Sequence, residues 1–248
     1  MDKTVVKAFR VLELLAQAEA PTSLTKLATQ TGLQKSNVHR LLGTLCELGY
    51  AHRGESSLYG PSLRVWELGQ RVYSRLSIAS TARTHLHKLM QKTGESAHLA
   101  VFDRSEIVYL DRVETANPVR AYTVIGGRAP AYCTASGKAL LAAQPPQTVR
   151  AVAATIRRQT AETIADHAAL VRELANVRNQ GYAINIGEFR YNVAGLAAPV
   201  RLGNGETIAA VGISGPLDRL RPRKVRSLAP IIVAAADAIA RAMHRMEG

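Results

Sequence analysis

Polar and basic side chains crowd the stretch after Leu33, in a pattern that suits contacts with nucleic acid. The set consists of Gln34, Lys35, Ser36, Asn37, His39, Arg40 and Thr44. Lys35 and Arg40 can reach phosphates or guanine, and Ser36 can donate to a phosphate. Gln34 and Asn37 can pair with adenine. Such residues more often form the solvated face of a helix, so their meaning depends on the elements that position them.

Residues 22–60 predict a helix, a tight turn, a second helix and a β-hairpin. Ser23 suits the N-cap of the first helix and is also a candidate DNA contact, and Gly32 ends this helix. The second helix begins near Gln34 or Lys35. Its hydrophobic face, at helical spacing, is Val38, Leu41, Leu42, Leu45 and Leu48. The hairpin holds Arg53, which we expect at the phosphate backbone. This order predicts a winged helix-turn-helix, whose second helix reads the major groove.

Helical patterns flank this module on both sides. Residues 4–18 predict an amphipathic first helix, and a further helix begins after Ser62 and carries Trp66. Trp66 packs either under the DNA-reading domain or against a partner chain. We therefore expect a DNA-binding domain over 1–62, a linker helix over 63–77, and a second domain over 78–248.

Length and composition agree with two globular domains. The chain has 248 residues, a net charge of +13 and two cysteines, Cys46 and Cys133. The positive charge suits a polyanionic partner, but it is spread over the whole chain, so it supports DNA binding only modestly. No apolar run approaches the ~20 residues of a membrane helix, and the N-terminus does not resemble a signal peptide. A cytoplasmic protein without disulfides is expected.

The larger second part alternates strands with helices. Predicted helices cover 78–92, a stretch after 135, 146–157, 163–180 and 222–246. Predicted strands cover 95–101, 107–112, 120–125, 182–186, 194–202 and 206–214. Gly203-Asn204-Gly205 predicts a hairpin turn between the last two strands. The fold class is α+β, with a central antiparallel sheet.

Motifs in both parts resemble the IclR family of bacterial transcription regulators. In the first part they are Lys35-Ser36-Asn37-Val38-His39-Arg40-Leu41-Leu42, Leu48-Gly49-Tyr50 and Tyr59-Gly60-Pro61. In the second they are Thr93-Gly94-Glu95, Gly126-Gly127-Arg128, Ser136-Gly137-Lys138-Ala139-Leu140, Gly181-Tyr182, Ala197-Ala198-Pro199-Val200 and Gly212-Ile213-Ser214. The resemblance covers nearly the whole chain. It implies a C-terminal effector-binding domain similar to GAF and PAS sensor folds.

The resemblance also implies an effector pocket between the sheet and the loop before the Gly137-Lys138 helix. The corresponding positions here are Thr134, Ala135, Ser136, Asn185, Gly195, Gly212 and Ser214. Relatives that bind small carboxylates carry Asp, Cys and Ser where this chain has Asn185, Gly195 and Gly212. Smaller side chains should enlarge the cavity, and an amide in place of a carboxylate eases anion binding. We therefore expect an aromatic or cyclic carboxylate. The alternative is that Asn185 and Ser214 are structural polar residues.

Two charged residues near this pocket have alternative roles. Arg128 could clamp a carboxylate, although such an arginine more often fixes a loop or an interface. Glu188 could hold the same loop by an ion pair.

Catalytic chemistry finds little support in the sequence. Cys133 with His98 or His167 could suggest a thiol nucleophile, but their spacing matches no known signature. Nucleophile-elbow, zinc-protease and phosphate-loop motifs are absent. We expect no enzyme activity, no cofactor and no metal. The rival interpretation is an enzyme or metabolite-binding protein with a vestigial helix-turn-helix.

The resemblance leads to a functional expectation for the whole chain. It predicts a repressor-type regulator of a catabolic operon that responds to a small organic acid. Dimers would form through the N-terminal domains, and the assembly would be either this homodimer or a homotetramer in which two dimers pair through the effector domains. Each dimer would bind a near-palindromic double-stranded operator.

Overall fold

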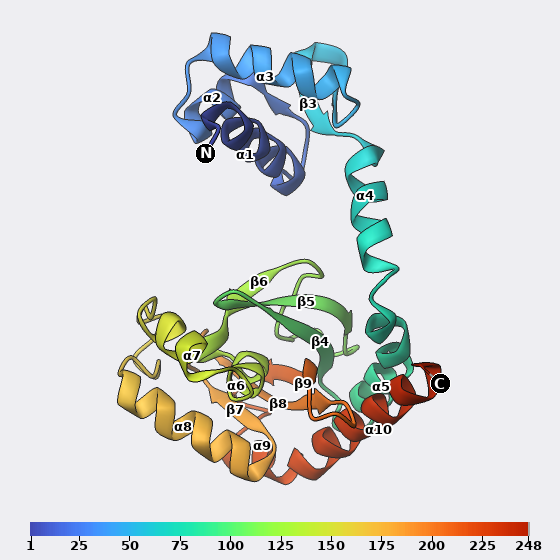
Figure 1. The fold of residues 1–248 in the computed structure, drawn as a ribbon, viewed down its shortest axis with the longest axis vertical. Coiled ribbons are helices and arrows are strands. Elements are labelled where there is room, and N and C mark those ends of the chain that lie inside the picture. The colour runs from blue at the N-terminus through green and yellow to red at the C-terminus, as the bar shows by residue number, and fades with distance from the viewer. Residues whose placement is uncertain (248) are drawn as a thin grey trace. The chain divides into compact units, whose positions relative to one another are not determined.

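The computed structural model describes residues 1–247 and divides into two compact units. The first unit is Met1–Leu76, and the second begins at Ser77 (Figure 1). No helix in the described part of the chain is both long and apolar enough to cross a membrane.

The first unit is built on three helices. These are α1 (Lys3–Gln17), α2 (Leu24–Thr31) and α3 (Lys35–Glu47). Their shared core contains Val11, Leu27, Val38 and Leu42, none of which is exposed. Gly32 ends α2 in the left-handed conformation, with φ of 69°, which a glycine adopts without steric strain. This tight turn lets α2 and α3 pack against each other.

A small sheet completes the winged helix-turn-helix. Strands β2 (Ala51–Arg53) and β3 (Leu58–Pro61) pair antiparallel around a 3-10 turn, Glu55–Ser57. The two-residue strand β1 (Thr22–Ser23) also pairs with β3, which the sequence did not indicate. Leu48 was expected in the core, but it caps the end of α3 and is 52% exposed.

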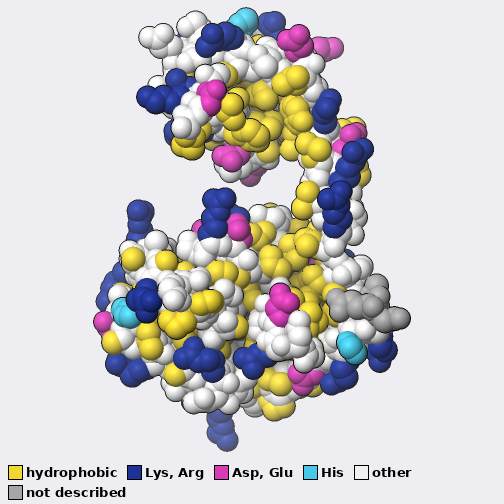
Figure 2. All heavy atoms as spheres, viewed as in Figure 1, with side chains coloured by type: hydrophobic (Ala, Val, Ile, Leu, Met, Phe, Trp, Pro, Cys, Tyr) yellow, Lys and Arg dark blue, Asp and Glu magenta, His cyan; other side chains and the backbone are white. Residues whose placement is uncertain are grey.

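The linker helix α4 (Leu63–Tyr73) buries none of its residues. Trp66 is 64% exposed in the single chain, so the expectation that it packs under the DNA-reading domain is wrong. On the face drawn in Figure 2, basic side chains are scattered over both units rather than gathered in one patch.

The second unit contains a six-stranded antiparallel sheet in the order β6-β5-β4-β9-β8-β7. Its strands are β4 (Ser96–Asp103), β5 (Glu106–Val113), β6 (Arg128–Pro130), β7 (Ala183–Ile186), β8 (Val193–Arg201) and β9 (Thr207–Pro216). Ser96 pairs with Ser214, and Gly195 pairs with the same Ser214 from the other side. The predicted α+β class with a central antiparallel sheet is confirmed.

The second unit also holds helices, some of which contact this sheet directly while others pack on neighbouring helices. They are α5 (Ser77–Thr93), α6 (Ala135–Leu141), α7 (Pro146–Ala153), α8 (His167–Gln180), α9 (Pro222–Ser227) and α10 (Ala229–Glu247). Helices α5 and α10 contact each other and the sheet (Figure 1). Helix α6 is buried along its length and shares a core with α7, α8 and the sheet alanines Ala100, Ala197 and Ala210.

Two predicted elements of this unit are wrong. Residues 120–125 form no strand, because the edge of β5 is taken by β6, which pairs Glu106 with Pro130. The predicted helix over 222–246 is broken at Leu228. Pro230 explains the break, since proline has no N–H to donate to the preceding turn and its ring clashes there. It is accommodated as the second residue of α10.

Candidate functional site

Helix α3 presents its polar residues to solvent and its apolar residues to the core. Val38, Leu41, Leu42 and Leu45 are buried. Their polar neighbours Gln34, Lys35, Ser36, His39, Arg40 and Thr44 are exposed, and Asn37 is half-buried. The Gln34 side chain makes no cap hydrogen bond, so it leaves the first amides of α3 without a side-chain acceptor. A helix N-terminus with free amides and basic neighbours suits DNA phosphates and base edges.

Three further predicted DNA contacts have local partners in the structure. The Ser23 hydroxyl is half-buried and accepts from the Lys26 amide at 3.3 Å, so it caps α2. Thr44 donates to the carbonyl of Arg40 at 3.2 Å. Arg53 is exposed on the hairpin and donates to the Ser57 hydroxyl at 2.6 Å. Arg53 and Thr44 remain accessible, whereas Ser23 already has a structural role.

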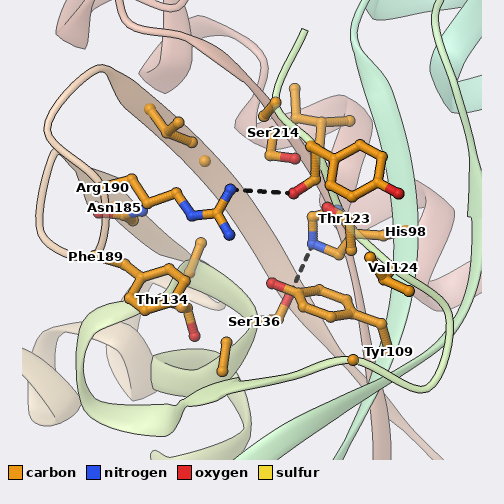
Figure 3. Close-up of a pocket in the computed structure, with 18 of the residues that line it drawn as sticks. His98, Tyr109, Thr123, Val124, Thr134, Ser136, Asn185, Phe189, Arg190 and Ser214 are labelled. Carbon is orange, nitrogen blue, oxygen red and sulfur yellow. Dashed lines mark hydrogen bonds between the residues drawn. The ribbon is translucent and has the colours of Figure 1, made fainter. Parts of the chain in front are cut away.

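A cavity of about 130 Å³ opens in the second unit, between the sheet and the start of α6. Figure 3 shows side chains converging on it from several elements. Of the seven predicted effector residues, the six that line it are Thr134, Ala135, Ser136, Asn185, Gly195 and Ser214. The strand register explains this, because Gly195 pairs with Ser214 and Asn185 pairs with Gly195.

Gly212 is the exception among the predicted residues. It does not line the cavity, and a Cβ there would lie 2.6 Å from the carbonyl oxygen of Leu196. Glycine is therefore required by the close approach of β8 and β9. The expectation that its small size enlarges the cavity is wrong. Gly195 does face the cavity, where a Cβ would meet Ala135 at 3.5 Å.

A buried histidine and serine lie at the cavity wall. The Nε2 atom of His98 is 2.9 Å from the Ser136 hydroxyl (Figure 3). Burial lowers the pKa of His98 to about 4, so the imidazole is neutral at pH 7. Its Nδ1 atom and the Ser214 hydroxyl are buried without a hydrogen-bond partner in the described structure. These two groups hold unused hydrogen-bonding capacity beside the cavity.

The charged residues that line the cavity are both arginines, Arg128 and Arg190. Arg128 forms ion pairs with Asp103 at 2.6 Å and Glu106 at 2.7 Å, so it fixes its loop. Arg190 reaches the carbonyl of Tyr122 at a long 3.5 Å, and no ion pair of Arg190 is found within residues 1–247 (Figure 3). Its guanidinium therefore has donors available for an anion.

The comparisons with known proteins agree over nearly the whole chain. Residues 70–241 match the bacterial transcriptional regulator IclR C-terminal family, and residues 4–55 match the IclR helix-turn-helix domain. The probable transcriptional regulator SauR of Cupriavidus necator is 34% identical, with 95% of each chain covered. The chain belongs to the IclR family. It is therefore a DNA-binding transcriptional regulator, and the family is not one of enzymes.

Two other IclR-family proteins show how far the similarity extends. The HTH-type transcriptional regulator KdgR of Escherichia coli is 32% identical, over 97% of this chain and 92% of its own. A crystal structure of an IclR homologue from Microbacterium hydrocarbonoxydans, complexed with 4-hydroxybenzoate, superposes with a TM-score of 0.85. It is 27% identical and covers 98% of this chain and all of its own.

In this IclR-family chain, a buried ion-pair network holds the loop that carries Arg190. The Asn185 side chain accepts from the Glu188 amide at 2.8 Å. The Glu188 carboxylate accepts from Lys138 at 2.6 Å, and Lys138 also bonds Glu173 at 2.9 Å. Burial raises the pKa of Glu188, and the Lys138 ammonium opposes this. Glu188 thus pairs with Lys138 on α6, and the expectation that it holds the Arg128 loop is wrong.

Several cavity residues escaped the sequence reasoning. They are Tyr109, Tyr122, Phe189 and Arg190, together with His98, which had been considered only as a partner of Cys133. The sequence signal for His98 was its place on the inward-facing side of a strand whose side chains alternate between the two faces of the sheet. Tyr122 and Arg190 lie in irregular segments, where no periodicity marks the inward side. Burial raises the pKa of Cys133 to about 12, which keeps the thiol protonated and unreactive.

Proposed function

We propose that this regulator controls a catabolic operon in response to an aromatic or cyclic carboxylate bound in the cavity. The observation that carries the proposal is the cavity lining itself. It combines two arginines with the rings of Tyr109, Tyr122 and Phe189, and it includes no Asp or Glu. Such a lining favours a flat, apolar body with a negative group.

The size and polarity of the cavity restrict the class of ligand further. A volume of about 130 Å³ lies below the roughly 300–1,000 Å³ of drug-sized sites, so a single small ring suits it better than a nucleotide or an oligosaccharide. Burial raises the pKa of Tyr109 to about 12, so its phenol is a neutral hydrogen-bonding group. The amide of Asn185 adds no negative charge. The related protein complexed with 4-hydroxybenzoate supports this ligand class.

On the DNA side, α3 would enter the major groove of one operator half-site. Arg40 and Lys35 would contact guanine or phosphate, and Asn37 and Gln34 would contact adenine. Arg53 of the hairpin would contact the phosphate backbone of the DNA. Ser36, His39 and Thr44 would border the same groove. Two copies would bind a near-palindromic double-stranded site, since one symmetric dimer matches two half-sites.

Exposed apolar residues in the first unit support a dimer. Val5, Val6 and Phe9 of α1 are 43–61% exposed, and Trp66 of α4 is 64% exposed. Figure 2 shows apolar side chains gathered over the first unit. A patch of this kind marks an interaction surface. The effector domains would then join two dimers into a homotetramer.

Ligand binding would change the population of DNA-competent assemblies. A coupling of about 1–3 kcal/mol gives a 5- to 150-fold change in operator affinity. Relatives named as repressors, such as the acetate operon repressor of Salmonella typhimurium, favour repression as the sign.

A thermal-shift screen tests the ligand class. The purified chain is incubated with 4-hydroxybenzoate, with its neutral analogue 4-hydroxybenzamide, and with the short acids pyruvate and glyoxylate. We expect stabilisation by the aromatic acid, weaker stabilisation by the amide, and none by the short acids. Stabilisation by the short acids alone would overturn the proposal.

A further inference from the structure

A second hollow, the arginine groove, lies elsewhere on the sensing unit. It has a volume of about 770 Å³ and shares no residue with the effector cavity. Its walls come from α7, α8, the end of α6 and the β8–β9 hairpin. Its lining residues are Ala142, Ala143, Gln144, Pro146, Val149, Arg150, His167, Val171, Leu174, Arg178, Arg201, Gly205 and Thr207. The volume falls within the roughly 300–1,000 Å³ of organic ligand sites.

The floor of the arginine groove is apolar. Val149 and Leu174 are buried at its base, and Val171 is 40% exposed. On α8, His167, Val171, Leu174 and Arg178 follow helical spacing, so one face of the helix forms a wall. An apolar floor of this kind can bury the hydrocarbon part of a ligand.

The polar lining is positive. Arg150, Arg178 and Arg201 come from three different elements, and no acidic residue lines the groove. No ion pair of these three arginines is found in the described part of the chain, residues 1–247. Arg178 is oriented by donating to the carbonyl of Ala142 at 3.1 Å. The nearby Asp166 caps α8, accepting from the Ala169 amide at 2.7 Å, and does not line the groove.

We propose that the arginine groove is a second effector site, for an organic anion with a carboxylate or phosphate head on an apolar body. Guanidinium groups bind both heads through paired N–H donors. Three guanidinium groups without a local counter-ion create a positive electrostatic potential over the groove. The apolar floor of the groove would bury the hydrocarbon body of the ligand. This site is distinct from the aromatic-acid cavity, and the proposal does not rest on which ligand that cavity binds.

Helix α6 connects the two sites. Its first turn carries Ala135 and Ser136 into the effector cavity, and Ala142 at its end accepts the hydrogen bond of Arg178 in the groove. Seven residues span only about 10 Å, and all of them are buried. A ligand that moves Arg178 therefore acts on the helix that lines the cavity.

Isothermal titration calorimetry with the full chain tests this site. The probes are octanoate and phenyl phosphate, with octanamide as the uncharged match for octanoate and acetate as the head group alone. We expect saturable binding of octanoate or phenyl phosphate and no binding of octanamide or acetate. The double variant Arg150→Ala/Arg201→Ala should bind at least about tenfold more weakly. Arg172→Ala, an exposed arginine of α8 outside the groove, should bind like the wild type.

Several outcomes would overturn the second site. They are the absence of saturable binding by either acid, equal binding of octanamide, or unchanged affinity in the double variant. The affinity for 4-hydroxybenzoate is measured with and without saturating octanoate. A change supports coupling through α6, and an unchanged affinity overturns the coupling. Loss of 4-hydroxybenzoate binding in Arg190→Ala, with octanoate binding intact, separates the two sites.

Discussion

Arg190 has the greatest capacity to bind an anion among the cavity side chains. Arg128 already neutralises Asp103 and Glu106, whereas Arg190 has only the long contact to the Tyr122 carbonyl and the Phe189 ring at 5.5 Å. Its remaining donors can form a forked pair with a carboxylate. Glu188 and Asn185 hold the adjoining backbone, so the position of Arg190 is set before a ligand arrives.

Arg190→Ala should weaken 4-hydroxybenzoate binding by roughly 10- to 150-fold, since hydrogen bonds to a charged group contribute about 1.5–3 kcal/mol. Calorimetric titration measures the effect. Arg172→Ala serves as the matched control and should leave the affinity unchanged. Equal affinity in the wild type and Arg190→Ala would exclude this arginine from ligand binding.

His98 makes stability depend on pH. The unfolded chain takes up a proton on this imidazole near pH 6.5, whereas the folded chain stays neutral down to about pH 4. Stability therefore falls as pH drops from 6.5 towards 4, by about 2 kcal/mol between pH 7 and pH 5. Urea unfolding followed by circular dichroism should show a smaller loss in His98→Gln. His87→Gln, at an exposed histidine, should keep the full loss. An unreduced loss in His98→Gln would contradict this account.

At the scale of elements, α1 and α4 each leave apolar side chains uncovered in a single chain. Val5, Val6 and Phe9 line a shallow hollow of about 610 Å³ with Met1, Asp2, Arg10 and Glu13. Burying about 100 Å² of apolar surface contributes roughly 2.5 kcal/mol, so a few such residues sustain an interface. Helix α4 buries none of its residues, so a similar interface with a partner chain would stabilise it.

Phe9→Glu should shift the chain towards monomers, because it places a charge in the apolar patch. Phe9 is 61% exposed, so the fold of the monomer should not change. Sedimentation velocity measures the mass, and circular dichroism checks the fold. Lys3→Glu, at an exposed residue on the same helix outside this hollow, is the matched control. An unchanged assembly would remove α1 from the dimer interface.

Hydrophobic periodicity predicted the helices and strands that bury one face. Where two segments could pair with the same strand edge, packing in the folded chain decided which of them formed a strand. The helices around Val11, Leu27 and Val38 and the strands around Ser214 follow their sequence patterns. Residues 120–125 alternate like a strand, yet β6 occupies the available edge and leaves Tyr122 to line the cavity. For the site, strand register brought Asn185, Gly195 and Ser214 together. Arg190 lies on a loop, and no local pattern indicates where a loop residue points.

At the scale of the whole molecule, the helix-turn-helix and the proposed effector cavity belong to separate compact units. We therefore expect that a substitution can remove DNA binding or effector binding without unfolding the other unit. The polar residues of α3 lie in the first unit, and the effector cavity and the arginine groove lie in the second. The connection is a single exposed helix, α4.

Arg40→Ala should lower specific operator affinity by about 5- to 150-fold, the loss expected for one base contact of about 1–3 kcal/mol. Mobility shifts across a salt series measure it, because non-specific binding is lost first as salt rises. The thermal shift with 4-hydroxybenzoate should not change. Arg75→Ala, after α4, is the control. Unaffected operator binding in Arg40→Ala, together with substrate turnover, would favour the rival interpretation of a vestigial reading domain.

The exposure of Trp66 has a spectroscopic consequence. It is the only tryptophan of the chain, and it lies on the helix that joins the two units. Its indole is 64% exposed in the single chain, so its fluorescence should be red-shifted and readily quenched by iodide. Assembly or a change in the linker would alter that emission. The native protein therefore carries an intrinsic optical reporter on the helix that joins the DNA-binding unit to the proposed sensing unit.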